Sequence, residues 1–301
     1  MQRHLRKLSI YWDEKLRFQV KMAGDILCSS CRAFAQHSCM NLSAALAFYT
    51  ILSLIPFLFL LVSVAAYILG SSEQAHRMVQ VLLNGLFPHT SDVVFKEVQA
   101  ISNRAAVLGL LGFLSMIWTA SVIFSSLEAA MMVVFRIETK RKFWKAKLLA
   151  LAMIPAAGLI FFLSLFVTAF SGVMETFEFT LFGVDIARSF LLEFFLGYIL
   201  PYLVLVLALT AIYKIIPNTD IAFRHALSGG ATGAFLFELA KHFFAWYIGR
   251  SQQYSIIYGS LEAIVILVLW AFYSSIILLF CAELVSEYRR RDISLLEKAF
   301  L

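Results

Sequence analysis

The 301-residue chain is 61% hydrophobic and only 15% charged, its net charge is +6, and its mean hydropathy is +0.83. Soluble globular proteins do not have this composition, which excludes an ordinary soluble enzyme or binding domain and indicates an integral membrane protein. A positive net charge can also mark a nucleic-acid partner, so the positions of the basic residues decide between the two explanations.

Six apolar segments are long enough to cross a bilayer, because a transmembrane helix needs about 20 mostly apolar residues. We therefore predict an all-α integral membrane protein, a bundle of six transmembrane helices with amphipathic interfacial helices. The predicted spans are about 43–69, 105–135, 148–172, 190–213, 226–248 and 259–285, which together make a membrane domain over 43–285. Residues 1–42 are expected to be a partly amphipathic N-terminal region, and 286–301 a basic tail. No cleavable signal peptide is expected, because a polar, basic stretch precedes the first apolar segment.

The basic residues indicate the orientation of the chain in the membrane. Nineteen of the 25 Lys and Arg lie before the first span, after the sixth, or in the connections between spans two and three and between spans four and five. Cytoplasmic loops carry an excess of Lys and Arg, so both termini are predicted to be cytoplasmic. This orientation accounts for the positive charge, and no nucleic-acid partner is expected. The clusters Arg141-Lys142 and Arg289-Arg290-Arg291 could contact anionic lipid headgroups.

Near the N-terminus, Cys28 and Cys31 followed by His37 and Cys39 resemble a set of zinc ligands. A second pair at standard spacing is missing, and the thiols would face a reducing cytoplasm. We favour a structural role for these residues, and expect no metal and no other cofactor.

The first span contains Pro56, which should kink the helix because proline removes one backbone hydrogen bond. The carbonyl that this frees could be satisfied by Ser53 or by a neighbouring helix. About 35 residues then separate spans one and two, a length at which connections usually carry structure or function. We predict two short amphipathic helices there, lying on the outer face of the membrane.

In the second span, Ser121, Ser125 and Glu128 follow Trp118 at steps of three and four, so the four residues share one helical face. We expect this face to point into the bundle, where the Glu128 carboxylate would need a partner or water. The alternative is that these polar groups only hydrogen-bond across a tight helix interface.

The fifth span places charged residues near the middle of the bilayer. Glu238 lies three residues before Lys241 and four before His242, so all three can meet on one helical face. Ionisable side chains at this depth indicate a functional site. A purely structural ion pair is the alternative. Earlier in the same span, Gly229 and Gly233 are spaced for close approach of another helix.

The sixth span carries Glu262 and Glu283, about 31 Å apart along a helix, so that one acid lies at each interface. Acids at an interface are a weaker sign of function than acids at the centre. Glu283, His242 and Tyr258 are possible accessory residues. Aromatic anchors at the headgroup level are expected near the outer ends of spans five and six: Trp246, Tyr247, Tyr254 and Tyr258.

Several motifs together resemble the YihY/BrkB family of bacterial inner-membrane proteins. They are Asn41, Ala44 and Leu46-Ala47-Phe48-Tyr49; Ser53-Leu54-Ile55-Pro56; Tyr213 and Pro217; Leu236-Phe237-Glu238 and Lys241; Tyr254, Tyr258-Gly259 and Leu261; Leu269-Trp270; and Cys281-Ala282-Glu283-Leu284. The resemblance implies six spans in the bacterial cytoplasmic membrane. Some members carry the label ribonuclease BN, and members have been linked to serum resistance and envelope properties. Cys281 replaces the usual glycine, and Glu262 stands where a small residue is common.

Three functions are compatible with these observations. The first is a permease, or a protein that handles lipids or other envelope components, with Glu128, Glu238 and Lys241 around a polar intramembrane site and an amphipathic small molecule as substrate. The second is a non-transporting scaffold that docks envelope-assembly proteins through residues 71–104, between spans one and two, and through its basic cytoplasmic ends. The ribonuclease activity comes third and is disfavoured, because RNA does not enter hydrocarbon and no metal-ligand set accompanies the acids. No catalytic residues are assigned, and the sequence leans away from an enzyme. The substrate, the coupling ion and the oligomeric state of the protein are not predicted.

Overall fold

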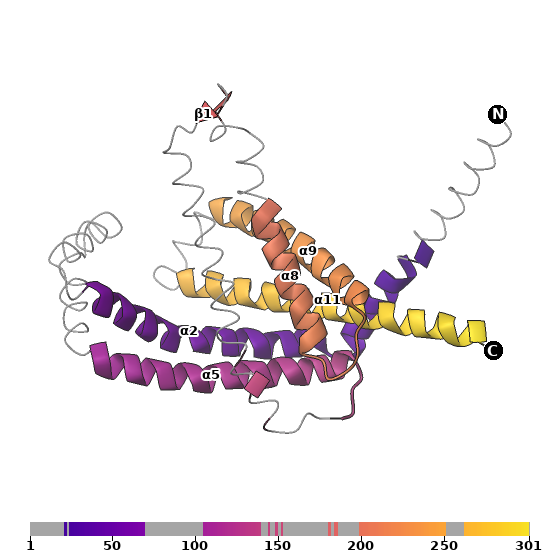
Figure 1. Cartoon of the computed structure of the whole chain (residues 1–301), viewed down its shortest axis with the longest axis horizontal. Coiled ribbons are helices and arrows are strands. Elements are labelled where there is room, and N and C mark those ends of the chain that lie inside the picture. Colours follow the sequence, from indigo (N-terminus) through magenta and orange to yellow (C-terminus); the bar gives the residue numbers. More distant parts are fainter. Residues whose placement is uncertain are drawn as a thin grey trace.

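A computed structural model describes residues 21–22, 24–69, 105–139, 144, 148–149, 152, 180–181, 184–185, 199–250 and 262–300 (Figure 1). A helical segment over 24–36 leads through a turn at 37–38 into the first long helix. The main helices are α2 (Cys39–Leu69), α5 (Ala105–Val134), α8 (Leu200–Ile215), α9 (Phe223–Arg250) and α11 (Glu262–Phe300).

The described part contains one small departure from the all-α prediction. Strands β1 (Thr180–Leu181) and β2 (Val184–Asp185) pair antiparallel, with Thr180 opposite Asp185. The β-branched side chains of Thr180 and Val184 favour extended backbone. The ladder has only two residues on each side, so the architecture remains that of packed helices.

Helix α11 joins two helix pairs. Figure 1 shows α2 beside α5, α8 beside α9, and α11 between the two pairs, and α11 contacts both α2 and α9 extensively. The buried core is concentrated toward one end of this arrangement, where α2 and α9 begin and α5 and α8 end. The N-terminal segment and the last third of α11 meet at the same end.

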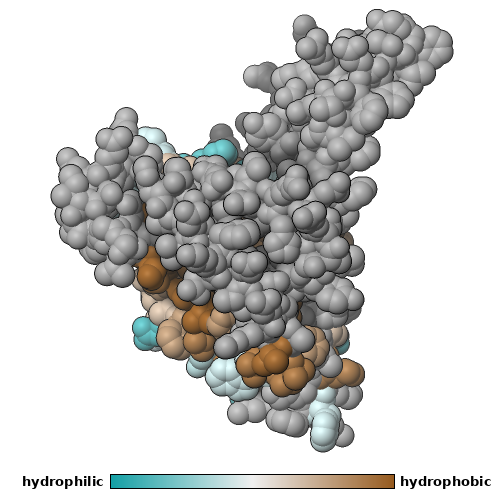
Figure 2. All heavy atoms as spheres, turned by 90° about the vertical axis from the view of Figure 1, so that its left-hand side faces the viewer, coloured by the Kyte–Doolittle hydropathy of each residue, from teal (hydrophilic) through white to brown (hydrophobic). Residues whose placement is uncertain are grey.

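Three described segments are long and apolar enough to cross a membrane: Cys39–Leu60, Gly109–Val134 and Ile264–Leu295. They correspond to predicted spans one, two and six. Large apolar side chains such as Phe48, Phe113 and Ile264 are exposed, as expected of helices that face lipid. Figure 2 shows such apolar surface among the coloured atoms of one face.

The other predicted spans are only partly represented in the structure. Helix α8 is a shorter apolar helix within predicted span four, and α9 covers predicted span five as one continuous helix. Predicted span three and the two helices expected between spans one and two lie almost wholly outside the described residues. The structure therefore supports a helical membrane protein, and six spans remain a prediction.

Helix α2 continues through Pro56 without ending. The Ser53 hydroxyl donates a hydrogen bond to the Thr50 carbonyl at 2.6 Å. The carbonyl that Pro56 leaves without its helical partner is that of Leu52, four residues earlier. The expectation that Ser53 satisfies this carbonyl is therefore wrong, because the Ser53 hydroxyl bonds to the Thr50 carbonyl in the preceding turn.

Three glycines in α9 let it approach two helices at once. A Cβ at Gly229 would lie 2.1 Å from a Val285 methyl group on α11, and one at Gly230 would lie 2.2 Å from Thr210 Oγ1 on α8. A Cβ at Gly233 would meet Leu209 at 2.9 Å. The predicted pair Gly229 and Gly233 thus lies at helix contacts. Gly230, which the four-residue spacing did not single out, lies at a contact of similar closeness.

Candidate functional site

The charged residues of α9 make the local contacts that helical spacing predicts. Lys241 Nζ lies 2.7 Å from Glu238 Oε1, and His242 Nε2 lies 3.7 Å from the same oxygen. The Glu238 and Lys241 side chains are 35% and 53% exposed, and that of His242 is 71% exposed. The group therefore lies on a partly open side of α9 and not within the buried core.

The predicted polar face of span two does not point inward. Trp118 is 62% exposed, Ser125 is exposed, and the Ser125 hydroxyl donates a hydrogen bond to the Ser121 carbonyl of its own helix at 2.8 Å. Larger apolar side chains, among them Phe124 and Met131, occupy the buried side of α5 instead.

Glu128 is half-buried. Among the described residues, no hydrogen bond or ion pair links Glu128 to Glu238 or Lys241. The polar site formed by these three residues therefore stays a prediction.

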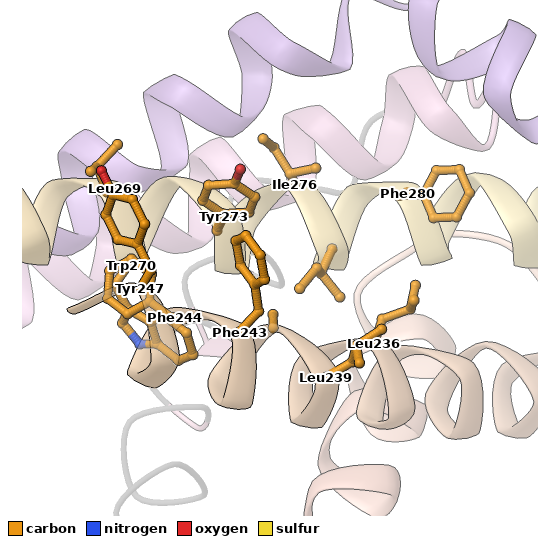
Figure 3. A pocket seen from close by; sticks show the side chains of 12 residues that line it. Leu236, Leu239, Phe243, Phe244, Tyr247, Leu269, Trp270, Tyr273, Ile276 and Phe280 are labelled. Carbon is orange, nitrogen blue, oxygen red and sulfur yellow. The ribbon is translucent and has the colours of Figure 1, made fainter. Parts of the chain in front are cut away.

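A groove lies between α9 and α11, with a volume of about 810 Å³. Figure 3 shows side chains from both helices pointing into the space between them. Trp270 anchors one end, with its ring centroid 5.3 Å from that of Phe237 and 5.1 Å from that of Phe244. The groove is lined by Leu236, Leu239, Ala240, Phe243, Phe244, Tyr247, Leu269, Trp270, Tyr273, Ile276, Ile277 and Phe280.

The groove and the charged group use different sides of α9. Successive helical residues are separated by about 100°, so Glu238 lies nearly opposite Ala240, which lines the groove. The lining carries only two hydroxyl groups and one indole N–H as polar side-chain groups. This surface suits an apolar ligand, because a polar solute would leave its hydrogen bonds unmade there.

A second cluster joins the N-terminal turn, the end of α5 and the second half of α11. We call it the polar junction and define it as His37, Cys39, Arg136, Glu283 and Glu287. Glu283 is fully buried, and its Oε1 lies 2.5 Å from His37 Nδ1 and accepts a 3.5 Å hydrogen bond from the Cys39 thiol. The sequence placed Glu283 at an interface, whereas its carboxylate is enclosed.

Arg136 extends the polar junction from α5. Its Nε donates to His37 Nε2 at 3.4 Å, and its guanidinium contacts Glu287 Oε1 at 3.2 Å. Arg136 has a positive φ of 53° immediately after α5, the left-handed conformation common where helices end. This turn brings the guanidinium back toward the histidine and the acid. The same Glu287 oxygen also accepts a hydrogen bond from Arg290.

The arginine cluster of α11 makes contacts within the molecule. Arg289 donates to Thr219 Oγ1 at 2.9 Å, and Arg291 pairs with Asp25 at 3.1 Å. Arg290 pairs with Glu287, as described above. The expectation that these side chains contact lipid headgroups stays a prediction, since the Arg290 side chain is 54% exposed despite its contact with Glu287. Arg141 and Lys142 lie outside the described residues.

His225, near the start of α9, is another buried polar side chain. Its Nε2 lies 3.2 Å from Asp292 Oδ2, although the ring N–H is not aligned for a hydrogen bond, and its ring packs edge-on against Tyr288. Burial lowers the pKa of His225, and the Arg224 guanidinium acts in the same direction against the opposing effect of Asp292. No motif singled out this residue, which precedes the predicted span.

The possible zinc ligands are not assembled. Cys28 and Cys31 are exposed on the helical segment, whereas Cys39 is buried against Glu283. Within the described ranges, no group of three His, Cys, Asp or Glu residues is placed to hold a metal ion. Tyr258 lies outside the described residues, as does the side chain of Glu262.

Apolar helices that can cross a bilayer, packed around a buried polar junction, define a helical membrane protein. The chain belongs to the family described as Virulence factor BrkB, whose model matches residues 30–299. The resemblance inferred from the motifs is confirmed.

Related proteins are described as UPF0761 membrane proteins. One from Legionella pneumophila (strain Corby) is 27% identical over 91% of this chain and 64% of its own length. One from Alkalilimnicola ehrlichii is 29% identical over 83% of this chain and 55% of its own length, and one from Pseudoalteromonas atlantica is 27% identical over 91% and 89%. The chain thus spans about three fifths of the length of the first two of these relatives. No solved structure matches it.

Proposed function

We propose that the protein is a multi-pass protein of the bacterial inner membrane, with both termini in the cytoplasm, that handles a membrane lipid. The observation that carries this proposal is the apolar groove between α9 and α11, whose 810 Å³ are lined almost entirely by aliphatic and aromatic side chains. A lipid acyl chain has the chemistry that this lining accepts.

Binding in such a groove would depend on shape more than on hydrophobicity. The surrounding bilayer is as apolar as the groove, so moving an acyl chain between them changes little hydrophobic free energy. Close contact with the rings of Phe243, Phe244 and Trp270 would supply dispersion attraction. The groove therefore favours a chain that fits between these rings.

The polar intramembrane site remains a separate proposal. Glu238 and Lys241 lie on the other side of α9 from the groove, so they would contact a different part of a substrate or serve another step. No observation on the described residues favours the scaffold role, because residues 71–104 lie outside them.

Photo-crosslinking with a phospholipid that carries a diazirine on one acyl chain tests the proposal. The purified full chain in lipid nanodiscs should be labelled on peptides containing Phe243 and Trp270 more strongly than on the exposed α5 peptide around Phe113. Ala240→Phe, which places a ring in the groove, should remove this excess labelling. Ala245→Phe is the matched control, because Ala245 is exposed and does not line the groove.

Labelling of the groove no stronger than that of α5 contradicts the proposal. So does an Ala240→Phe variant that folds and is labelled like the wild type.

A further inference from the structure

The carboxylate of Glu283 is completely buried yet only half satisfied. Its Oε1 has two partners, His37 Nδ1 and the Cys39 thiol, while its Oε2 has none among the described residues. Ser43 lies one helical turn after Cys39 on α2, and its hydroxyl is likewise buried without a partner in the described part of the chain. Buried polar atoms without partners are uncommon and call for a ligand or a change of state.

The hydrogen-bond geometry assigns the proton on the histidine. Arg136 always donates, so its contact with His37 Nε2 requires that nitrogen to be unprotonated. The remaining ring proton is then on Nδ1 and is donated to Glu283 Oε1. One series of hydrogen bonds thus runs from Arg136 after α5, through His37 in the N-terminal turn, to Glu283 on α11.

The groups that face this pair come from three elements. The start of α2 and the turn before it contribute Cys39 and His37, the turn after α5 contributes Arg136, and α11 contributes Glu287 beside Glu283. Arg136 hydrogen-bonds to His37 and to Glu287, and its positive charge also acts on the Glu283 carboxylate through space.

Adding one proton changes this series of hydrogen bonds in a defined way. On Glu283 Oε2 the proton removes a buried negative charge and supplies the unpartnered atom with an O–H donor. The hydrogen bond from His37 then loses its charged acceptor, and charge-assisted hydrogen bonds are roughly twice as strong as neutral ones. Protonation of Glu283 therefore weakens this series of hydrogen bonds.

We propose that the Glu283 carboxylate is a proton-binding site, and that its protonation weakens the hydrogen bond from His37 that fastens the N-terminal turn to α11. The His37 side chain is 17% exposed and that of Glu283 is not exposed at all. The site shares no residue with the apolar groove, and the proposal does not require a lipid to bind there.

Hydrogen–deuterium exchange of the full chain in nanodiscs tests the proposal. Protection factors for the amides of residues 36–42, corrected for intrinsic exchange, are compared from about pH 8 to about pH 5, a range in which proteins are generally most stable. We expect wild-type protection to fall roughly tenfold on acidification, the scale of weakening one hydrogen bond to a charged group. Glu283→Gln mimics the protonated acid and should show low protection at every pH.

Glu297→Gln is the matched control, since it removes an exposed acid from the same helix, outside the polar junction, and should keep the pH dependence. Wild-type protection that does not change with pH overturns the proposal, as does a folded Glu283→Gln variant that retains the wild-type pH dependence. If Glu283→Gln does not fold, Glu283→Asp replaces it. Aspartate keeps a titratable carboxyl group, so loss of the pH dependence in that variant also contradicts the site.

Discussion

Replacing Gly230 with alanine should destabilise the protein, because α9 and α8 are in contact at this position. The added Cβ would lie 2.2 Å from Thr210 Oγ1 and 2.8 Å from the Val206 carbonyl oxygen. The Thr210 hydroxyl is held by a 2.7 Å hydrogen bond to that same carbonyl, so it cannot turn away without losing the bond. The helices must therefore move apart.

The expected magnitude is the difference between two opposing effects. Overpacking of this kind costs about 1–3 kcal/mol. Alanine is favoured over glycine within a helix by about 1 kcal/mol. Gly24→Ala is the matched control, because a Cβ at Gly24, in the helical segment 24–36, meets nothing within 4 Å. Both variants gain helix propensity, so the difference between them isolates the steric strain.

Thermal unfolding in detergent micelles measures both variants. Gly230→Ala should unfold several degrees below Gly24→Ala, since about 1 kcal/mol corresponds to roughly 2–4 °C in a chain of comparable or somewhat smaller size. Adding Thr210→Ala should restore part of the loss, because it removes the nearest clashing atom and neighbouring substitutions do not act additively. Equal unfolding temperatures for the two glycine variants would refute the close approach of α8 and α9.

Three further predictions concern single side chains. Tyr213→Phe should lower the free energy of unfolding by about 1 kcal/mol in chemical denaturation, because it removes the hydrogen bond from this buried hydroxyl to a backbone carbonyl of α11. The lowered pKa of His225 means that the native state binds fewer protons than the unfolded state just below the ordinary value of 6.5. Stability should therefore fall as pH drops through that value, and the decline should be smaller in His225→Phe when unfolding is followed against pH. Lys241→Met should change the unfolding temperature little in detergent micelles, because side-chain pairs three or four residues apart on a helix contribute about 0.2–0.5 kcal/mol. A lost envelope phenotype in that stable variant would then support a functional role for the pair with Glu238, and an intact phenotype would count against it.

The contacts that sequence could predict are the local ones. The pairing of Glu238 with Lys241 follows from helical spacing alone, and the structure contains it. The direction in which a helical face points depends on its neighbours, and here prediction failed: Trp118 and Ser125 are exposed, whereas Phe124 and Met131 take the buried side of α5. Gly230 was missed because glycines spaced four residues apart mark one helical face, whereas α9 packs against other helices on two faces.

The polar junction could not be predicted by any local pattern. His37 and Glu283 are 246 positions apart, and only the folded arrangement of α2, α5 and α11 brings them together. The one usable signal was an acid directly after two small residues, Cys281 and Ala282, in an otherwise apolar helix. Small side chains there leave room for close packing, and both are fully buried. The family resemblance contained this motif but assigned it no role.

Helix α11 is one uninterrupted element of 39 residues, about 58 Å long and nearly twice the thickness of a bilayer's hydrocarbon core. Trp270 in the groove and Glu283 in the polar junction lie about 20 Å apart on this single rod. Because both residues lie on one helix, a rotation or axial shift of α11 at one of them also moves the other. If a bound acyl chain displaces α11, thermodynamic reciprocity requires that protons and lipid alter each other's affinity by the same factor.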